Sequence, residues 1–205
     1  MEAAGVIFGF FVLIFSVVIH EYCHGLAAYH NGDDTAYLLG RLTLNPLAHL
    51  DPVGSVLLPI ITSMTLHVPF GYAKPVPINP RRFRDYRKGM IVVGGAGCAA
   101  NFTLGVIFSL LIRFSPNETA RTVFFLAAYI NFLLCFFNLI PVPPLDGSRI
   151  LSMIVPPEIG RFFDRIERYG IIIVYAIIMF GGFGFISPIC RFFVQNISGL
   201  ARPMF

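Results

Sequence analysis

Long apolar blocks are the feature that most constrains how this chain can fold. Residues 3–19 contain one polar side chain, Ser16, and residues 90–112, 123–140 and 171–186 are comparably apolar. A helix needs roughly 20 apolar residues to cross a hydrocarbon layer about 30 Å thick, so each block is close to the required length. Charged residues make up only 13% of the chain, well below their share in soluble domains. We therefore predict an all-α polytopic membrane protein.

Breaks between these blocks predict about four to six membrane helices in a single domain. Residues 53–66 form an apolar stretch of only about fourteen residues, which suits a re-entrant segment better than a full crossing. Residues 35–44 are rich in Leu, Tyr and Thr, which predicts a small β hairpin. We interpret residues 1–205 as one membrane-embedded domain, with a core over 3–155 and C-terminal helices over 156–205.

The first apolar block ends in an H-E-x-x-H motif, His20-Glu21-Tyr22-Cys23-His24. Side chains four residues apart lie on one side of a helix, about 6 Å apart in rise, so both imidazoles can reach one zinc ion. Glu21 stands beside the first ligand and can act as general base on a metal-bound water. Three such polar groups are costly in a membrane helix unless they have partners, which argues against a chance match.

Two histidines leave a catalytic zinc in need of a third protein ligand. Of the eleven acidic residues, only Asp146 lies within a hydrophobic stretch, where a zinc ion would supply the counter-charge that a buried carboxylate needs. Asp51 is the alternative, although an Asp-Pro pair is more simply explained as a turn cap. Cys23 is a further alternative, but it lies about 100° around the helix from His24.

Two motifs together resemble the site-2 protease family of intramembrane zinc metalloproteases. H-E-x-x-H is followed, more than a hundred residues later, by the Asn-x-x-Pro-x-Pro-x-x-Asp-Gly of residues 138–147. Residues 45–54 and 71–80 resemble stretches of a compact prokaryotic branch, and residues 95–101 resemble the family's Gly-rich helix start. The resemblance implies one Zn²⁺ per chain, held by His20, His24 and Asp146, with Glu21 as the base.

Two asparagines lie within these motifs, and the resemblance implies a role for one of them, Asn138. Asn138 would hold the substrate backbone or the developing oxyanion, although a hydrogen bond between helices would explain it equally well. Asn101 fits a structural role better, as a polar tie between close-packed helices in a glycine-rich region. The prolines Pro141, Pro143 and Pro144 should hold their segment extended, and with a strand at residues 35–44 they could clamp an unwound substrate.

The expected activity is hydrolysis of transmembrane substrate proteins within the lipid bilayer, in a bacterial or archaeal cell membrane. Basic loops at residues 74–88 and 161–168 predict the cytoplasmic side, and a re-entrant segment at 53–66 would place the active site towards that face. The net charge of +4 fits loop charge and predicts no nucleic-acid partner. The alternatives are a proteolytically inactive zinc-binding scaffold of the same fold and a metal transporter.

Overall fold

The computed structural model describes residues 3–66 and 71–199, and within these ranges the regular structure is entirely helical. This confirms the predicted all-α polytopic membrane fold. The α-helices are α1 (Ala3–His30), α2 (Thr35–Leu38), α3 (Leu58–Leu66), α4 (Tyr86–Arg113), α5 (Glu118–Asn138), α6 (Asp146–Ile154), α7 (Pro157–Ile166), α8 (Gly170–Met179) and α9 (Gly182–Ser198). Short 3-10 turns at Pro46–His49, Pro80–Arg82 and Glu167–Tyr169 and a π-helical turn at Pro52–Leu57 complete the set.

Three of these helices, α1, α4 and α5, are long and apolar enough to cross a membrane. The C-terminal helices form a pair bent by 74°, which would add a fourth span if it crosses as one unit. The apolar block at residues 171–186 does not form one continuous helix, because the chain breaks at Gly181. Gly181 has φ +89°, a left-handed conformation that glycine adopts without strain, so α8 ends there and α9 starts in a new direction.

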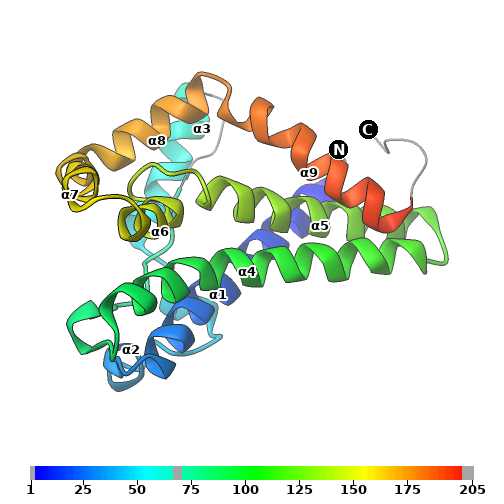
Figure 1. Ribbon diagram of the computed structural model, residues 1–205. Helices are drawn as coiled ribbons and strands as arrows, with labels where there is room; N and C mark the ends of the chain where they lie inside the picture. Colours follow the sequence, from blue (N-terminus) through cyan, green and yellow to red (C-terminus); the bar gives the residue numbers. More distant parts are fainter. Residues whose placement is uncertain (1–2, 67–70, 200–205) are drawn as a thin grey trace.

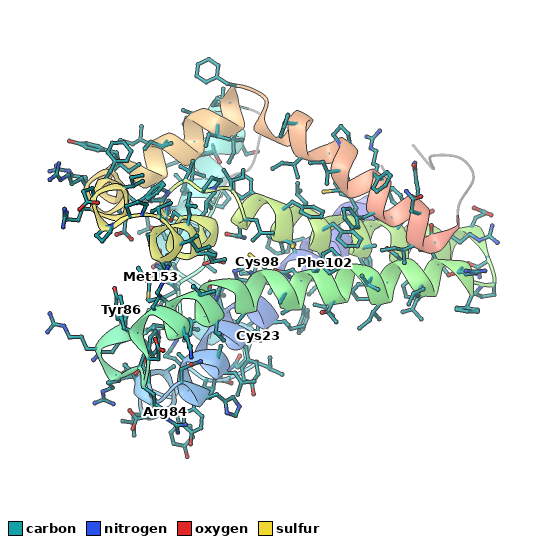
Figure 2. The ribbon with its side chains drawn as sticks, viewed as in Figure 1. Cys23, Arg84, Tyr86, Cys98, Phe102 and Met153 are labelled. Carbon is teal, nitrogen blue, oxygen red and sulfur yellow. The ribbon has the colours of Figure 1, made fainter. Side chains whose placement is uncertain are left out.

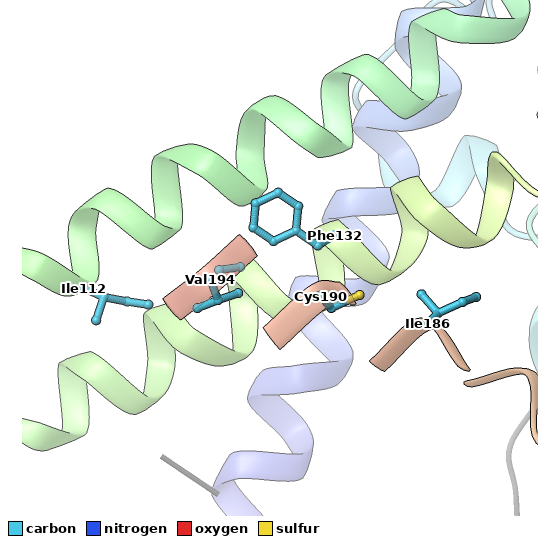
Figure 3. Close-up of a cluster of buried hydrophobic side chains, with 6 residues drawn as sticks. Ile112, Phe132, Ile186, Cys190 and Val194 are labelled. Carbon is cyan, nitrogen blue, oxygen red and sulfur yellow. The ribbon is translucent and has the colours of Figure 1, made fainter. Parts of the chain in front are cut away.

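The spanning helices pack as a bundle in which α4 and α5 lie side by side and antiparallel, with α1 crossing both (Figure 1). On their other side, α9 covers α4 and α5 and closes an apolar core (Figure 3). Phe132 is fully buried at its centre, where Gly105 of α4 leaves room for the ring. The fully or nearly buried members of this core are Ile112, Ala128, Phe132, Ile186, Cys190 and Val194.

The predicted β hairpin at residues 35–44 was wrong: this stretch forms the short helix α2 and a turn. Asp33 is buried, and its carboxylate accepts hydrogen bonds from both the backbone N–H and the hydroxyl of Thr35, which starts a helical turn. Gly40 has φ +65°, and Arg41 N–H donates to the Ala36 carbonyl to close that turn. Local capping satisfies the backbone here, so no strand partner is needed.

The predicted re-entrant stretch leaves the bundle and returns to where it started. Asp51 caps the π-helical turn before α3 by accepting from two backbone N–H groups. After α3, the N–H of Tyr72 donates to the Gly54 carbonyl at 3.0 Å, so the two ends of the stretch lie together. The N–H of Arg84 then donates to the Asn31 carbonyl at 2.9 Å, which brings the start of α4 beside the end of α1. This is the arrangement predicted for a re-entrant segment.

Single introduced cysteines at Leu39, Lys88 and Asn117, in a background without the four native cysteines, test this topology. We expect Leu39 and Lys88 to be labelled by an impermeant thiol reagent from one face of the membrane, because the chain between α1 and α4 returns to that face. Asn117 should be labelled from the other face, because α4 crosses between them. Labelling of Leu39 and Lys88 from opposite faces would mean that α3 completes a crossing.

Candidate metal centre

Three potential metal ligands from two distant helices meet in the interior of the bundle. The Nε2 atoms of His20 and His24, on α1, lie 2.9 Å apart, and each is 3.1 Å from Oδ2 of Asp146 at the start of α6. All three residues are buried. Among the described residues, they form the one group of three His, Cys, Asp or Glu side chains placed to hold a metal ion. The structure therefore brings together the three ligands predicted from the sequence.

The other ring nitrogen of each histidine is held by a hydrogen bond. Nδ1 of His24 donates to the Val93 carbonyl of α4 at 2.6 Å. Nδ1 of His20 lies 2.6 Å from Oδ1 of Asn101, also on α4. Because both Nδ1 atoms donate, both Nε2 atoms keep a free lone pair directed towards Asp146. Such bonds fix the tautomer and the ring orientation of metal-binding histidines.

Asn101 is the centre of a buried network that joins three helices. Its amide NH₂ donates to the Ser16 carbonyl of α1 at 3.2 Å and to Oδ1 of Asn131, on α5, at 3.0 Å. Asn131 in turn donates to the Ala127 carbonyl. The structural tie predicted at Asn101 is present, and it also anchors His20. Asn131 was not predicted from the sequence, although a lone asparagine inside an apolar helix is itself a sign of an interhelical hydrogen bond.

A glycine makes the close approach of α4 to the histidines possible. A Cβ atom on Gly97 would lie 2.6 Å from Cε1 of His20 and closer still to Nε2 of His24, well inside van der Waals contact. The next residue, Cys98, points its thiol at Oδ2 of Asp146, at 3.8 Å, from the side of α4 that faces α5 and α6 (Figure 2).

The turn between α5 and α6 returns Asp146 to the level of the histidines. Val142 N–H donates to the Ile140 carbonyl and Leu145 N–H donates to the Val142 carbonyl. The proline-rich segment therefore forms turns, and the prediction that it is extended was wrong. Gly147 follows the aspartate because any side chain there would collide with the Leu139 carbonyl at the end of α5. The prolines and the glycine together therefore fold the chain back sharply.

Glu21 is anchored by a segment that lies far along the chain. Its Oε2 accepts a hydrogen bond from the backbone N–H of Val76 at 2.8 Å. Val76 is buried in the irregular stretch of residues 71–79, and its side chain packs at Gly25 of α1, the residue that follows the motif. Within the described residues, Oε1 of Glu21 has no hydrogen-bond partner. No sequence signal pointed to Val76.

The alternative ligands lie elsewhere. Both Asp51 and Cys23 are outside the three-residue group, and Asp51 serves as the helix cap predicted for it. Asn138 is the last residue of α5, and its amide donates to the Leu134 carbonyl of the same helix at 2.9 Å. Its suggested role towards substrate stays a prediction.

Known proteins with related sequences have names that refer to peptidases and zinc metalloproteases. The family model of "Peptidase family M50" matches residues 114–181, which include Asp146. The Bacillus subtilis protein "Putative zinc metalloprotease YwhC" is 40% identical over 171 residues, which cover 78% of this chain and 75% of that protein. This chain belongs to peptidase family M50. It is therefore an integral membrane protein of a metalloprotease family, in agreement with the resemblance to site-2 proteases.

More distant relatives have similar names. "Putative zinc metalloprotease Rip2" of Mycolicibacterium smegmatis is 29% identical over 83% of this chain and 68% of its own length. "Zinc metalloprotease MJ0392" of Methanocaldococcus jannaschii is 27% identical over 73% of this chain, but only 35% of its own length is covered. No solved structure matches the chain. Zinc is thus the metal that the family implies.

The three donor atoms fit a zinc ion. Ligands of a tetrahedral zinc, each 2.0–2.1 Å from the metal, lie about 3.3 Å from one another. The observed separations of 2.9, 3.1 and 3.1 Å are within a few tenths of an ångström of that spacing. Two imidazoles and one carboxylate also form a donor set found in catalytic zinc sites, which keep the fourth position open.

Purified protein should contain about one zinc per chain, and two glycine variants test how the site is built. We expect Gly97→Ala to lose most of the zinc, because the added methyl group would occupy the space of the histidine rings. Gly95→Ala is the matched control: it adds the same methyl group to the same helix, with no atom within 4 Å. Metal content by mass spectrometry of the intact protein is the measurement.

Asp146→Ala should also lose most of the zinc, because it removes one of only three protein ligands. Full zinc in this variant would show that another residue completes the site. Full zinc in Gly97→Ala would show that α4 does not approach the histidines as closely as described.

Proposed function

We propose that this protein is an intramembrane zinc metalloprotease that hydrolyses peptide bonds of transmembrane substrate proteins within the bilayer. The observation that carries the proposal is the convergence of His20, His24 and Asp146, with Glu21 beside them, inside a bundle of membrane-length helices. Membership of a metalloprotease family supports the same chemistry. The proposed partners are a transmembrane protein substrate and the surrounding lipid.

In the proposed reaction, His20, His24 and Asp146 would hold one zinc ion. A zinc ion held there would polarise the scissile carbonyl and lower the pKa of water enough for a base to deprotonate it near neutral pH. Glu21 accepts the proton of the attacking water on Oε1, the carboxylate oxygen that Val76 leaves free. Glu21 then delivers that proton to the departing amine nitrogen, which completes hydrolysis of the peptide bond.

The surroundings of the base support its role. The hydrogen bond from Val76 N–H fixes the position of the Glu21 carboxylate without neutralising its charge, because a backbone amide donates a hydrogen bond but is itself uncharged. Asn138, at the end of α5, remains the candidate for holding the substrate backbone or the oxyanion. Basic residues are concentrated around the start of α4 and along α7, on the same side of the bundle as the metal centre. We therefore further propose that the active site faces the cytoplasm.

Replacing Glu21 with glutamine separates a protease from an inactive scaffold. Glu21→Gln preserves size and should preserve zinc, but an amide cannot accept the proton. General-base catalysis contributes roughly 10²–10⁴-fold, so cleavage of a model membrane substrate should fall by that factor. Uncut substrate should accumulate on the variant in co-purification. Unchanged cleavage by Glu21→Gln would rule out this mechanism, whereas full activity in cells without any cleavage would favour the scaffold.

Replacing Val76 tests whether its N–H positions the base. Val76→Pro removes the donor in a stretch that already contains Pro75 and Pro77, whereas Val76→Ala removes only the side chain. A hydrogen bond to a charged group is worth about 1.5–3 kcal/mol, so we expect kcat of Val76→Pro to fall roughly 10–100-fold relative to Val76→Ala. Zinc content should be the same in both. Equal kcat values in the two variants would contradict this role.

A further inference from the structure

A second site lies outside the metal centre, in a cavity of about 550 Å³ between the first turn of α4, α6 and α7. Its apolar wall includes Met90 and Met153, and the labelled Tyr86 and Met153 lie close together where α4 meets α6 (Figure 2). None of the three candidate zinc ligands lines it. The charged residues that line it are Arg87, Arg149, Arg161 and Glu167.

The three arginines are only partly satisfied by the protein. Arg87 donates from Nε to the Met153 carbonyl at 2.7 Å, which orients its guanidinium at the cavity. The side chain of Arg149 makes no hydrogen bond or ion pair with any residue that the structure describes. Among the described residues, the Arg161 guanidinium pairs with Glu158 alone, and this exposed ion pair of 3.4 Å contributes little. Three arginines therefore line one cavity together with a single carboxylate residue, Glu167.

Several arginines around one cavity favour a phosphate group as ligand. The guanidinium is a planar fork of N–H donors that matches phosphate oxygens and can bind them in pairs. Hydroxyl groups of Ser148 and Ser152 also line the cavity, although each donates to a backbone carbonyl of its own helix.

The position of the cavity indicates where such a phosphate would come from. Tyr86 and Arg87 are the first residues of a membrane-length helix, so the cavity lies at a membrane interface. On α7, the apolar side chains Ile159 and Phe162 are exposed although arginines occupy the same helix. An amphipathic helix of this kind lies in the plane of the interface, with apolar side chains in the lipid and basic ones among the headgroups.

We propose that this cavity is a phosphate-binding site at the membrane surface, filled by the headgroup phosphate of an anionic phospholipid. The ligand joins Arg87 of α4, Arg149 of α6 and Arg161 of α7. Since α6 begins at Asp146, a bound headgroup also holds that residue's helix against α4. This coupling to the metal centre rests on the proposed function, but the binding site itself does not.

The test uses full-length protein, stripped of lipid and titrated with short-chain phosphatidylglycerol, phosphatidylcholine or inorganic phosphate. Native mass spectrometry counts the molecules bound. We expect the wild type to bind about one phosphatidylglycerol tightly, and Arg149→Gln to weaken that binding at least ~10-fold, the effect of losing a charged hydrogen bond. The Arg149 side chain has no hydrogen-bond or ion-pair partner among the described residues, so this variant should fold and keep its zinc.

Arg121→Gln is the matched control, because Arg121 lies near the opposite end of the α4–α5 pair and is paired with Glu118. It should bind phosphatidylglycerol as the wild type does. Tight binding that inorganic phosphate does not displace identifies the lipid as the source. Binding of inorganic phosphate alone, lost in Arg149→Gln, supports the site with a soluble phosphate compound as its ligand. Equal binding by wild type, Arg149→Gln and Arg121→Gln would overturn the proposal.

Discussion

The need to satisfy buried polar groups inside a membrane determines most of this structure. Each histidine of the H-E-x-x-H motif would be costly in an apolar bundle if its ring nitrogens had no partners. The carbonyl of Val93 and the amide of Asn101 provide those partners from α4, and Asn131 extends the network to α5. The hydrogen bonds that stabilise the buried histidines therefore also fix how α1, α4 and α5 pack.

Small residues allow this polar network to form. Gly97 brings the backbone of α4 against the histidine rings, and Gly147 lets the chain turn between α5 and α6. Neither position tolerates a Cβ atom without displacing a group that the centre needs. Elsewhere the packing is apolar, with Phe132 filling the space beside Gly105. Close packing and metal-binding geometry are thus two results of the same glycine placement.

The segments between α1 and α4 complete the centre without entering the bundle core. The stretch around α3 leaves and returns at Gly54 and Tyr72, and the chain then passes Val76 across the face of α1. Arg41 donates to the carbonyls of Lys74 and Pro75, which holds this passage in place. One side of the metal centre is therefore formed by irregular backbone, which can move more readily than the helices that carry the ligands.

The sequence alone predicted the membrane-helix fold and the three candidate ligands, because apolar length and the spacing of His20, His24 and Asp146 are properties of the linear chain. It also gave the cap at Asp51 and the shortness of the segment at residues 53–66. It failed at residues 35–44, where Asp33 and Gly40 favour local turns over a strand, and at the prolines of residues 141–144, where the segment is turned and not extended. Only the tertiary structure decided that Asn131 and Val76 belong to the centre. A hydrogen-bond partner is set by which segments pack together, and no pattern within either segment specifies that.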